Sequence, residues 1–158
     1  MVAEKTSLLN LLEIRKILEV HASILACKHA TNKDLAILRQ YIERMKRKAS
    51  SSKGWKEGED FEFHLAIAYA SKNPFLAVIL GAILDLSKEG RYTTLGSIGD
   101  ANHYFAEHKA MYEAIKAKDK NKASRIMQRH FEEAAEDIVK AKKREQSKMN
   151  IAHISPSQ

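Results

Sequence analysis

The chain has 158 residues, of which 44% are hydrophobic and 30% are charged, with only 6 glycines and 2 prolines. This composition excludes an intrinsically disordered chain, argues against a β-rich fold and suits one helical domain with its own core. The single cysteine, Cys27, excludes an internal disulfide and is typical of a reducing compartment, so we predict a cytoplasmic protein. We expect neither export nor membrane insertion, because a signal-peptide pattern is missing and the longest apolar run is shorter than the roughly 20 residues that span a bilayer.

The net charge of +7 and the isoelectric point near 9.4 are features that many nucleic-acid-binding proteins share. Much of the excess lies at predicted helix ends, in residues 46–48 and 140–144. Basic side chains at the C-terminal end of a helix complement its dipole. We therefore interpret these residues mainly as a solvated surface and tail, and keep a basic helical nucleic-acid-binding module without metal as an alternative.

Apolar residues recur at helical spacing in six stretches, which polar or glycine-containing segments separate. The predicted helices cover residues 6–30, 31–48, 59–71, 74–88, 101–118 and 120–145. Residues able to cap a helix stand at four of the N-terminal ends, namely Thr31, Asn73, Asp100 and Asp119. Short links between the helices predict an all-α antiparallel bundle of about six helices.

Two further features concern the limits of this domain and its surface. The predicted helix over residues 74–88 is apolar nearly all round, as expected of a central helix or of one at an oligomer interface. Residues 147–158 show no hydrophobic periodicity. We therefore expect residues 1–146 to form the domain and residues 147–158 to form a flexible C-terminal tail.

Three histidines and one aspartate form a candidate metal site. Asp60 and His64 are four residues apart, which places both on one face of a helix, and helical phase turns His108 and His130 toward the interior as well. Neutral imidazoles and one carboxylate suit zinc, nickel, iron or manganese better than calcium or magnesium. Each histidine alone is more often a packed core or surface residue, so the prediction depends on the set meeting at one point in the bundle.

The same residues belong to an ordered set of motifs that resembles the FCD domain, the C-terminal effector-binding domain of the FadR branch of GntR-type transcription regulators. The motifs are Leu11–Glu19, Ala30-Thr31 with Asp34-Leu35 and Leu38, Asp60-x-x-x-His64, Ala70–Pro74, Glu107-His108, Ala114-Ile115 with Asp119, and Met127-x-x-His130. They extend over about residues 8 to 138. The order of the whole set is far more specific than any single motif.

This resemblance implies a helical bundle that encloses one divalent transition metal ion, most often zinc or nickel, where small organic acids bind. By the same resemblance, Asp60, His64, His108 and His130 would hold the metal and Arg15 would hold an anionic effector. An ion pair between Arg15 and Glu13 or Glu19 is the alternative for that arginine. The family also implies a homodimer, and binding of DNA only through an N-terminal winged-helix domain, which we do not find in this sequence.

The resulting hypothesis is a metal-dependent sensor of small organic acids, within a GntR/FadR-type regulator whose DNA binding changes when the effector binds. We do not expect an enzyme. A metalloenzyme remains the other alternative, because an open metal position can activate water. Against it, Glu62 faces away from Asp60 and His64, so an inward carboxylate placed as a general base is not evident. The sequence leaves open which metal is bound, which acid is sensed and which genes are regulated.

Overall fold

The computed structural model describes residues 2–49, 59–85 and 101–154, and these are almost entirely helical, with no strand among them. The helices are α1 (Val2–His29), α2 (Asn32–Ala49), α3 (Glu59–Ala70), a helix over residues 74–85, α5 (Ala101–Lys116) and α6 (Lys120–Ile154). The predicted all-α bundle of six helices is confirmed. The predicted loops 49–58 and 90–99, the Asp100 cap and the end of the fourth helix lie wholly or mostly outside the described residues. Among the described helices, none is both long and apolar enough to cross a membrane.

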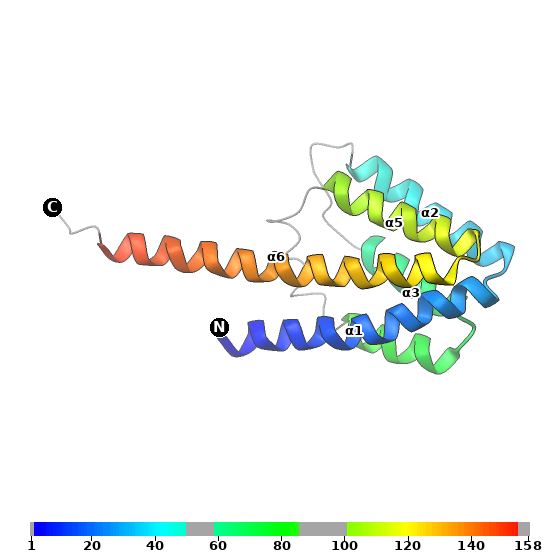
Figure 1. Cartoon of the computed structure of the whole chain (residues 1–158), viewed down its shortest axis with the longest axis horizontal. Coiled ribbons are helices and arrows are strands. Elements are labelled where there is room, and N and C mark those ends of the chain that lie inside the picture. Colours follow the sequence, from blue (N-terminus) through cyan, green and yellow to red (C-terminus); the bar gives the residue numbers. More distant parts are fainter. Residues whose placement is uncertain (1, 50–58, 86–100, 155–158) are drawn as a thin grey trace.

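The long helices α1 and α6 lie side by side and run in opposite directions along the length of the molecule (Figure 1). Helix α3 packs against α1 and α2, and α5 packs against α1, α2 and α6. Helices α3, α5 and α6 therefore surround a common interior, with α1 closing one side. The candidate ligands come from these three helices.

Three of the predicted caps are present as hydrogen bonds. Thr31 and Asp34 form a reciprocal pair, in which the Thr31 N–H donates to Asp34 Oδ2 (2.7 Å) and the Asp34 N–H donates to Thr31 Oγ1 (3.3 Å). The Leu76 N–H donates to Asn73 Oδ1 at 3.2 Å, and the Lys122 N–H donates to Asp119 Oδ1 at 2.9 Å. These hydrogen bonds define where α2, the helix over residues 74–85 and α6 begin.

Helix α6 is longer than predicted, because it continues to Ile154 rather than ending near Glu145. The predicted C-terminal tail of residues 147–158 therefore begins inside a helix. Beyond the bundle, a helix has no buried face and shows no hydrophobic periodicity, so the loss of periodicity did not mark a helix end. The sequence contains no glycine or proline from Lys120 to Ile154, and the first proline after this helix is Pro156.

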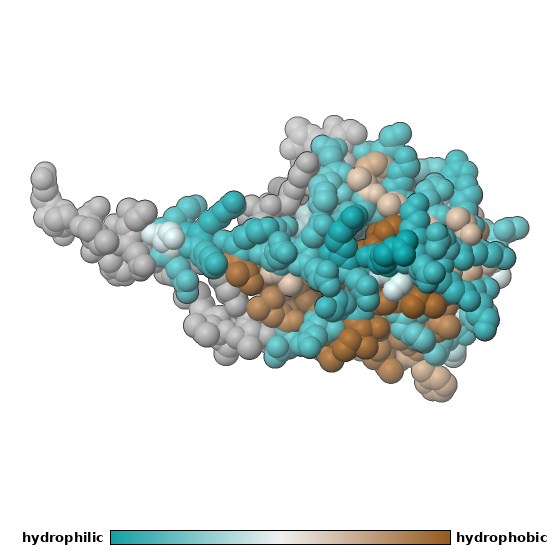
Figure 2. Space-filling view, in the orientation of Figure 1, coloured by the Kyte–Doolittle hydropathy of each residue, from teal (hydrophilic) through white to brown (hydrophobic). Residues whose placement is uncertain are grey.

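The helix over residues 74–85 is buried on one face only. Leu76, Leu80 and Leu84 belong to the core, whereas Phe75 is 79% exposed and Val78 is 72% exposed. Figure 2 shows apolar surface along the lower face of the molecule, over α1 and this helix. The sequence was consistent with a central helix or with a helix at an oligomer interface. In the structure, one apolar face of this helix is exposed.

Candidate metal centre

The bundle brings the four predicted ligands together in its interior. Asp60 and His64 project from α3, His108 from α5 and His130 from α6, and all four are buried. One ligand atom from each lies within 4.8 Å of the ligand atoms of the other three. Four side chains separated by up to 70 positions in the sequence thus converge on one point.

The ring nitrogens approach one another closely. His108 Nε2 lies 2.9 Å from Asp60 Oδ1 and 3.3 Å from His64 Nε2, and His64 Nε2 lies 3.5 Å from the same Asp60 oxygen. The His130 ring centroid is 5.0 Å from that of His108 and 5.2 Å from that of His64. Contacts of this length gather lone pairs around a small volume, as the ligands of a metal ion do.

The outward nitrogen of each imidazole faces an acceptor. His108 Nδ1–H donates to the Tyr104 carbonyl (2.7 Å), and His130 Nδ1–H donates to Glu107 Oε2 (3.1 Å). His64 Nδ1 contacts Glu19 Oε2. A proton held at Nδ1 leaves the lone pair on Nε2, so these acceptors select the tautomer that a metal-binding histidine needs. The residues therefore fit a divalent transition metal ion.

Glu19 is the strongest charge beside the cluster. Burial alone would raise the pKa of this carboxyl group, but Arg15 and His64 lower it to about 2. Burial would lower the pKa of His64, but Glu19 and Asp60 raise it to about 9 in the absence of an ion. A negative charge of this kind increases the basicity of an imidazole that binds a metal.

Arg15 is buried and paired. Its Nε donates to Glu19 Oε1 at 2.8 Å, and its guanidinium carbon lies 5.0 Å from the centre of the Phe131 ring. Of the two interpretations of Arg15, the structure therefore displays the ion pair with Glu19. Since the other oxygen of Glu19 contacts His64, the arginine is one carboxylate away from a predicted ligand.

Sequence reasoning did not identify two buried carboxylates, Glu19 and Glu107, as part of this site. Glu107 is held by His130, and although burial raises its pKa, this contact lowers it below the ordinary value. The i, i+4 spacing from Arg15 to Glu19 was a usable signal, because both must share one face of α1. The Glu19 carboxylate contacts His64, and the Glu107 carboxylate accepts a hydrogen bond from His130. Glu62 is exposed, as expected.

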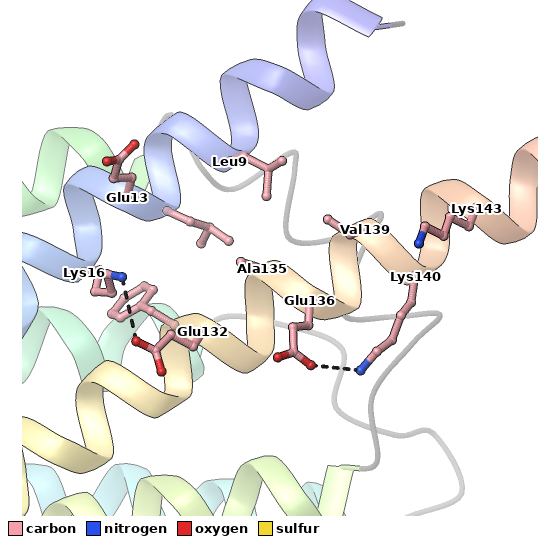
Figure 3. Close-up of a pocket in the computed structure, with 11 residues that line it drawn as sticks. Leu9, Glu13, Lys16, Glu132, Ala135, Glu136, Val139, Lys140 and Lys143 are labelled. Atoms are coloured by element: carbon pink, nitrogen blue, oxygen red, sulfur yellow. Dashed lines mark hydrogen bonds and ion pairs between the residues drawn. The ribbon is translucent and has the colours of Figure 1, made fainter.

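Among the described residues, a small cavity borders the cluster and a much larger groove lies nearby. The one lined by His64, His108 and His130 holds about 10 Å³, enough for about one water molecule and too small for an organic acid. A groove of about 630 Å³ lies between α1 and α6, and Leu9 and Val139 point into it (Figure 3). Phe131 lines this groove, and its ring centroid is 5.4 Å from that of His130. The Phe131 ring therefore forms part of the wall between the groove and the imidazoles.

The family model of the FCD domain matches residues 10–133, which is most of the chain. The chain belongs to the FCD domain family. The resemblance inferred from the motifs is confirmed, and the match includes all four candidate ligands and Arg15.

Curated relatives of this FCD domain are named as transcriptional regulators. The HTH-type transcriptional regulator LutR of Bacillus subtilis is 30% identical over 142 residues, which cover 86% of this chain and 64% of LutR. The Uxu operon transcriptional regulator of Escherichia coli is 29% identical over 136 residues, covering 82% of this chain and 53% of that protein. The chain thus spans between half and two thirds of the length of these relatives. Their names agree with the expectation that the chain is not an enzyme.

Solved structures share the fold of this FCD domain. The chain described as "E. coli McbR/YncC" superposes with a TM-score of 0.69 at 22% identity, over 84% of this chain and 64% of that one. A transcriptional regulator of the GntR family from Pseudomonas syringae gives a TM-score of 0.68 at 16% identity, over 87% of this chain and 57% of that one. The bundle is therefore an established arrangement of these helices.

Proposed function

We propose that this FCD domain is the effector-sensing part of a GntR-type transcription regulator and responds to a small organic acid at a bound zinc or nickel ion. The observation that carries the proposal is the convergence of Asp60, His64, His108 and His130, with the Nδ1 atom of each histidine held by an acceptor. Relatives named as transcriptional regulators support the regulatory role.

A bound metal ion would supply an open coordination position for a carboxylate of the effector. Arg15 lies close to this position, because Glu19 contacts both Arg15 and His64. An effector carboxylate would compete with Glu19 for the guanidinium group, which can form two parallel hydrogen bonds to such a ligand.

The small size of the cavity beside the imidazoles supports a two-state mechanism. Because about 10 Å³ beside the imidazoles cannot hold an organic acid, binding requires the surrounding helices or side chains to move. We propose that the acid enters through the groove between α1 and α6 and displaces the Phe131 ring. A ligand that binds only the open arrangement shifts the population toward it, and this shift is the signal.

The intact regulator would use this domain as a homodimer. The uncovered apolar face includes Phe75, Val78 and Ile79 of the helix over residues 74–85, and Ile79 is 50% exposed. A second copy that packs on this face would bury it. We propose that DNA is bound by a winged-helix domain outside these 158 residues, so that a change between two effector domains alters the spacing of two DNA-binding domains.

Calorimetric titration of zinc-loaded protein with acetate, lactate, succinate and citrate tests the sensor. At least one of these acids should bind the parent protein, and Arg15→Gln should weaken that binding at least tenfold. Arg39→Gln is the matched control, because Arg39 is an exposed arginine paired with Glu43 on α2. Failure of all four acids to bind, or equal binding to metal-free protein, would count against the proposal.

A further inference from the structure

A second group of metal-binding side chains lies on the surface between α5 and α6. His103 and Glu107 are one turn apart on α5, and Glu133 projects from α6. His103 Nε2 lies 2.6 Å from Glu133 Oε2 and 3.9 Å from Glu107 Oε2. One ligand atom from each of the three residues lies within 4.8 Å of the other two. The side chain of His103 is 51% exposed.

Besides the hydrogen bond from His130 to Glu107 Oε2, the four carboxylate oxygens of this group face His103 and Arg129. His103 approaches the Oε2 atoms of both Glu107 and Glu133. Arg129 approaches the two Oε1 atoms, with Nε 3.4 Å from Glu133 and 3.8 Å from Glu107. The arginine thus neutralises charge from one side of the carboxylates and leaves their other oxygens directed at the imidazole. Two oxygens and one nitrogen are therefore presented together on one side.

The buried carboxylate of the group is not fully satisfied. The Glu107 side chain is 3% exposed, and its Oε1 atom accepts no hydrogen bond from the residues that the structure describes. Its distance of 3.8 Å from Arg129 is too long for one. A buried carboxylate oxygen without a donor is costly, and a cation bound at Oε2 would reduce that cost because the two oxygens of the carboxylate share one negative charge.

We propose that His103, Glu107 and Glu133 form a second, solvent-facing site for a divalent transition metal ion, separate from the buried cluster. One imidazole nitrogen and two carboxylates are ligands typical of zinc or manganese, and the exposed side of His103 leaves room for water in the remaining positions. Glu107 also accepts a hydrogen bond from His130, so one carboxylate belongs to both groups. The second site needs no ligand of the buried cluster.

Zinc titration of the full chain tests this site, with tag-free protein stripped of metal and the stoichiometry read by calorimetry. The parent protein should bind two equivalents, whereas His103→Gln and Glu133→Gln should each bind one. His29→Gln is the matched control, because His29 is an exposed histidine outside both groups, and it should bind two. A second equivalent that survives in both His103→Gln and Glu133→Gln would overturn the proposal.

The titration also separates the second site from the buried centre. If the parent protein binds one equivalent, and His103→Gln retains it while His130→Gln loses it, the second site is overturned and the proposed function stands. If the parent protein binds one equivalent that His130→Gln retains and His103→Gln loses, the result supports the second site and counts against the buried centre. Asp60→Asn repeats the test of the buried centre if His130→Gln does not fold, which circular dichroism would show.

Discussion

Replacing Glu19 by glutamine would remove one negative charge from a chain of buried contacts while keeping the size of the side chain. Glu19 is 1% exposed, and its two oxygens contact Arg15 and His64. The substitution leaves the Arg15 guanidinium buried without a carboxylate. It also replaces one of the two carboxylate oxygens by an NH2 group, so a single oxygen remains to accept from both Arg15 and His64 Nδ1.

The size of the effect follows from the charge interactions. In the metal-free protein burial would raise the pKa of Glu19, but Arg15 and His64 lower it from 4.5 to about 2. At about 1.36 kcal/mol per pKa unit, this depression corresponds to about 3 kcal/mol of stability at neutral pH. Because the pKa in the folded state is the lower one, this stabilisation is complete above pH 4.5 and is lost as the pH falls toward 2. Breaking a buried ion pair on one side costs about 3–5 kcal/mol, which agrees.

Thermal unfolding in EDTA measures the loss of stability, and zinc titration measures the effect on the site. Glu19→Gln should lower Tm by about 6–12 °C, since about 1 kcal/mol shifts Tm by about 2–4 °C in a domain of this size. Zinc affinity should fall by about 10–100-fold. Glu13→Gln, an exposed glutamate on the same helix, should change stability by less than about 0.5 kcal/mol. Equal effects of the two substitutions would refute the role assigned to Glu19.

Three further outcomes are expected. Zinc at about 100 times its Kd should stabilise the folded protein by about 2.7 kcal/mol relative to EDTA, and calorimetry that shows the same Tm in both would contradict a bound metal. Asp119→Ala should cost about 1 kcal/mol in urea unfolding, because α6 loses the side chain that caps its first turn; unchanged stability would show that this cap is dispensable. Phe75→Glu combined with Val78→Glu should convert a dimer into a monomer by light scattering, whereas a dimer that persists would place the interface elsewhere.

Local signals were sufficient to predict most of the fold. The Thr31–Asp34 pair and the Asp119 cap mark helix starts that the structure reproduces, because capping depends on residues within one turn. The predicted C-terminal end of α6 was wrong, because the part of this helix that extends beyond the bundle shows no hydrophobic periodicity. Tertiary contact with the core, rather than helix formation itself, produces the pattern that sequence reasoning uses.

The same distinction between local signals and tertiary contacts applies to the residues of the candidate site. His64, His108 and His130 were predictable because helical phase turned each one inward. Glu19 and Glu107, which hold two of these rings, were not, since a buried glutamate resembles a surface glutamate until its partner on another helix is known. Arg15 shows the same limit. Its partner Glu19 could be named as an option, but only the tertiary contacts of Arg15 with Phe131 and of Glu19 with His64 select it.

Metal content per chain, measured on tag-free protein purified without chelator, tests the central proposal most directly. The parent protein should carry at least one zinc or nickel ion. His108→Ala and His130→Ala should each carry one ion fewer and should unfold at a lower temperature, because each removes a buried ligand. A metal-free parent protein, with both variants as stable as the parent, would contradict the metal centre and leave three imidazoles that are simply packed in the core.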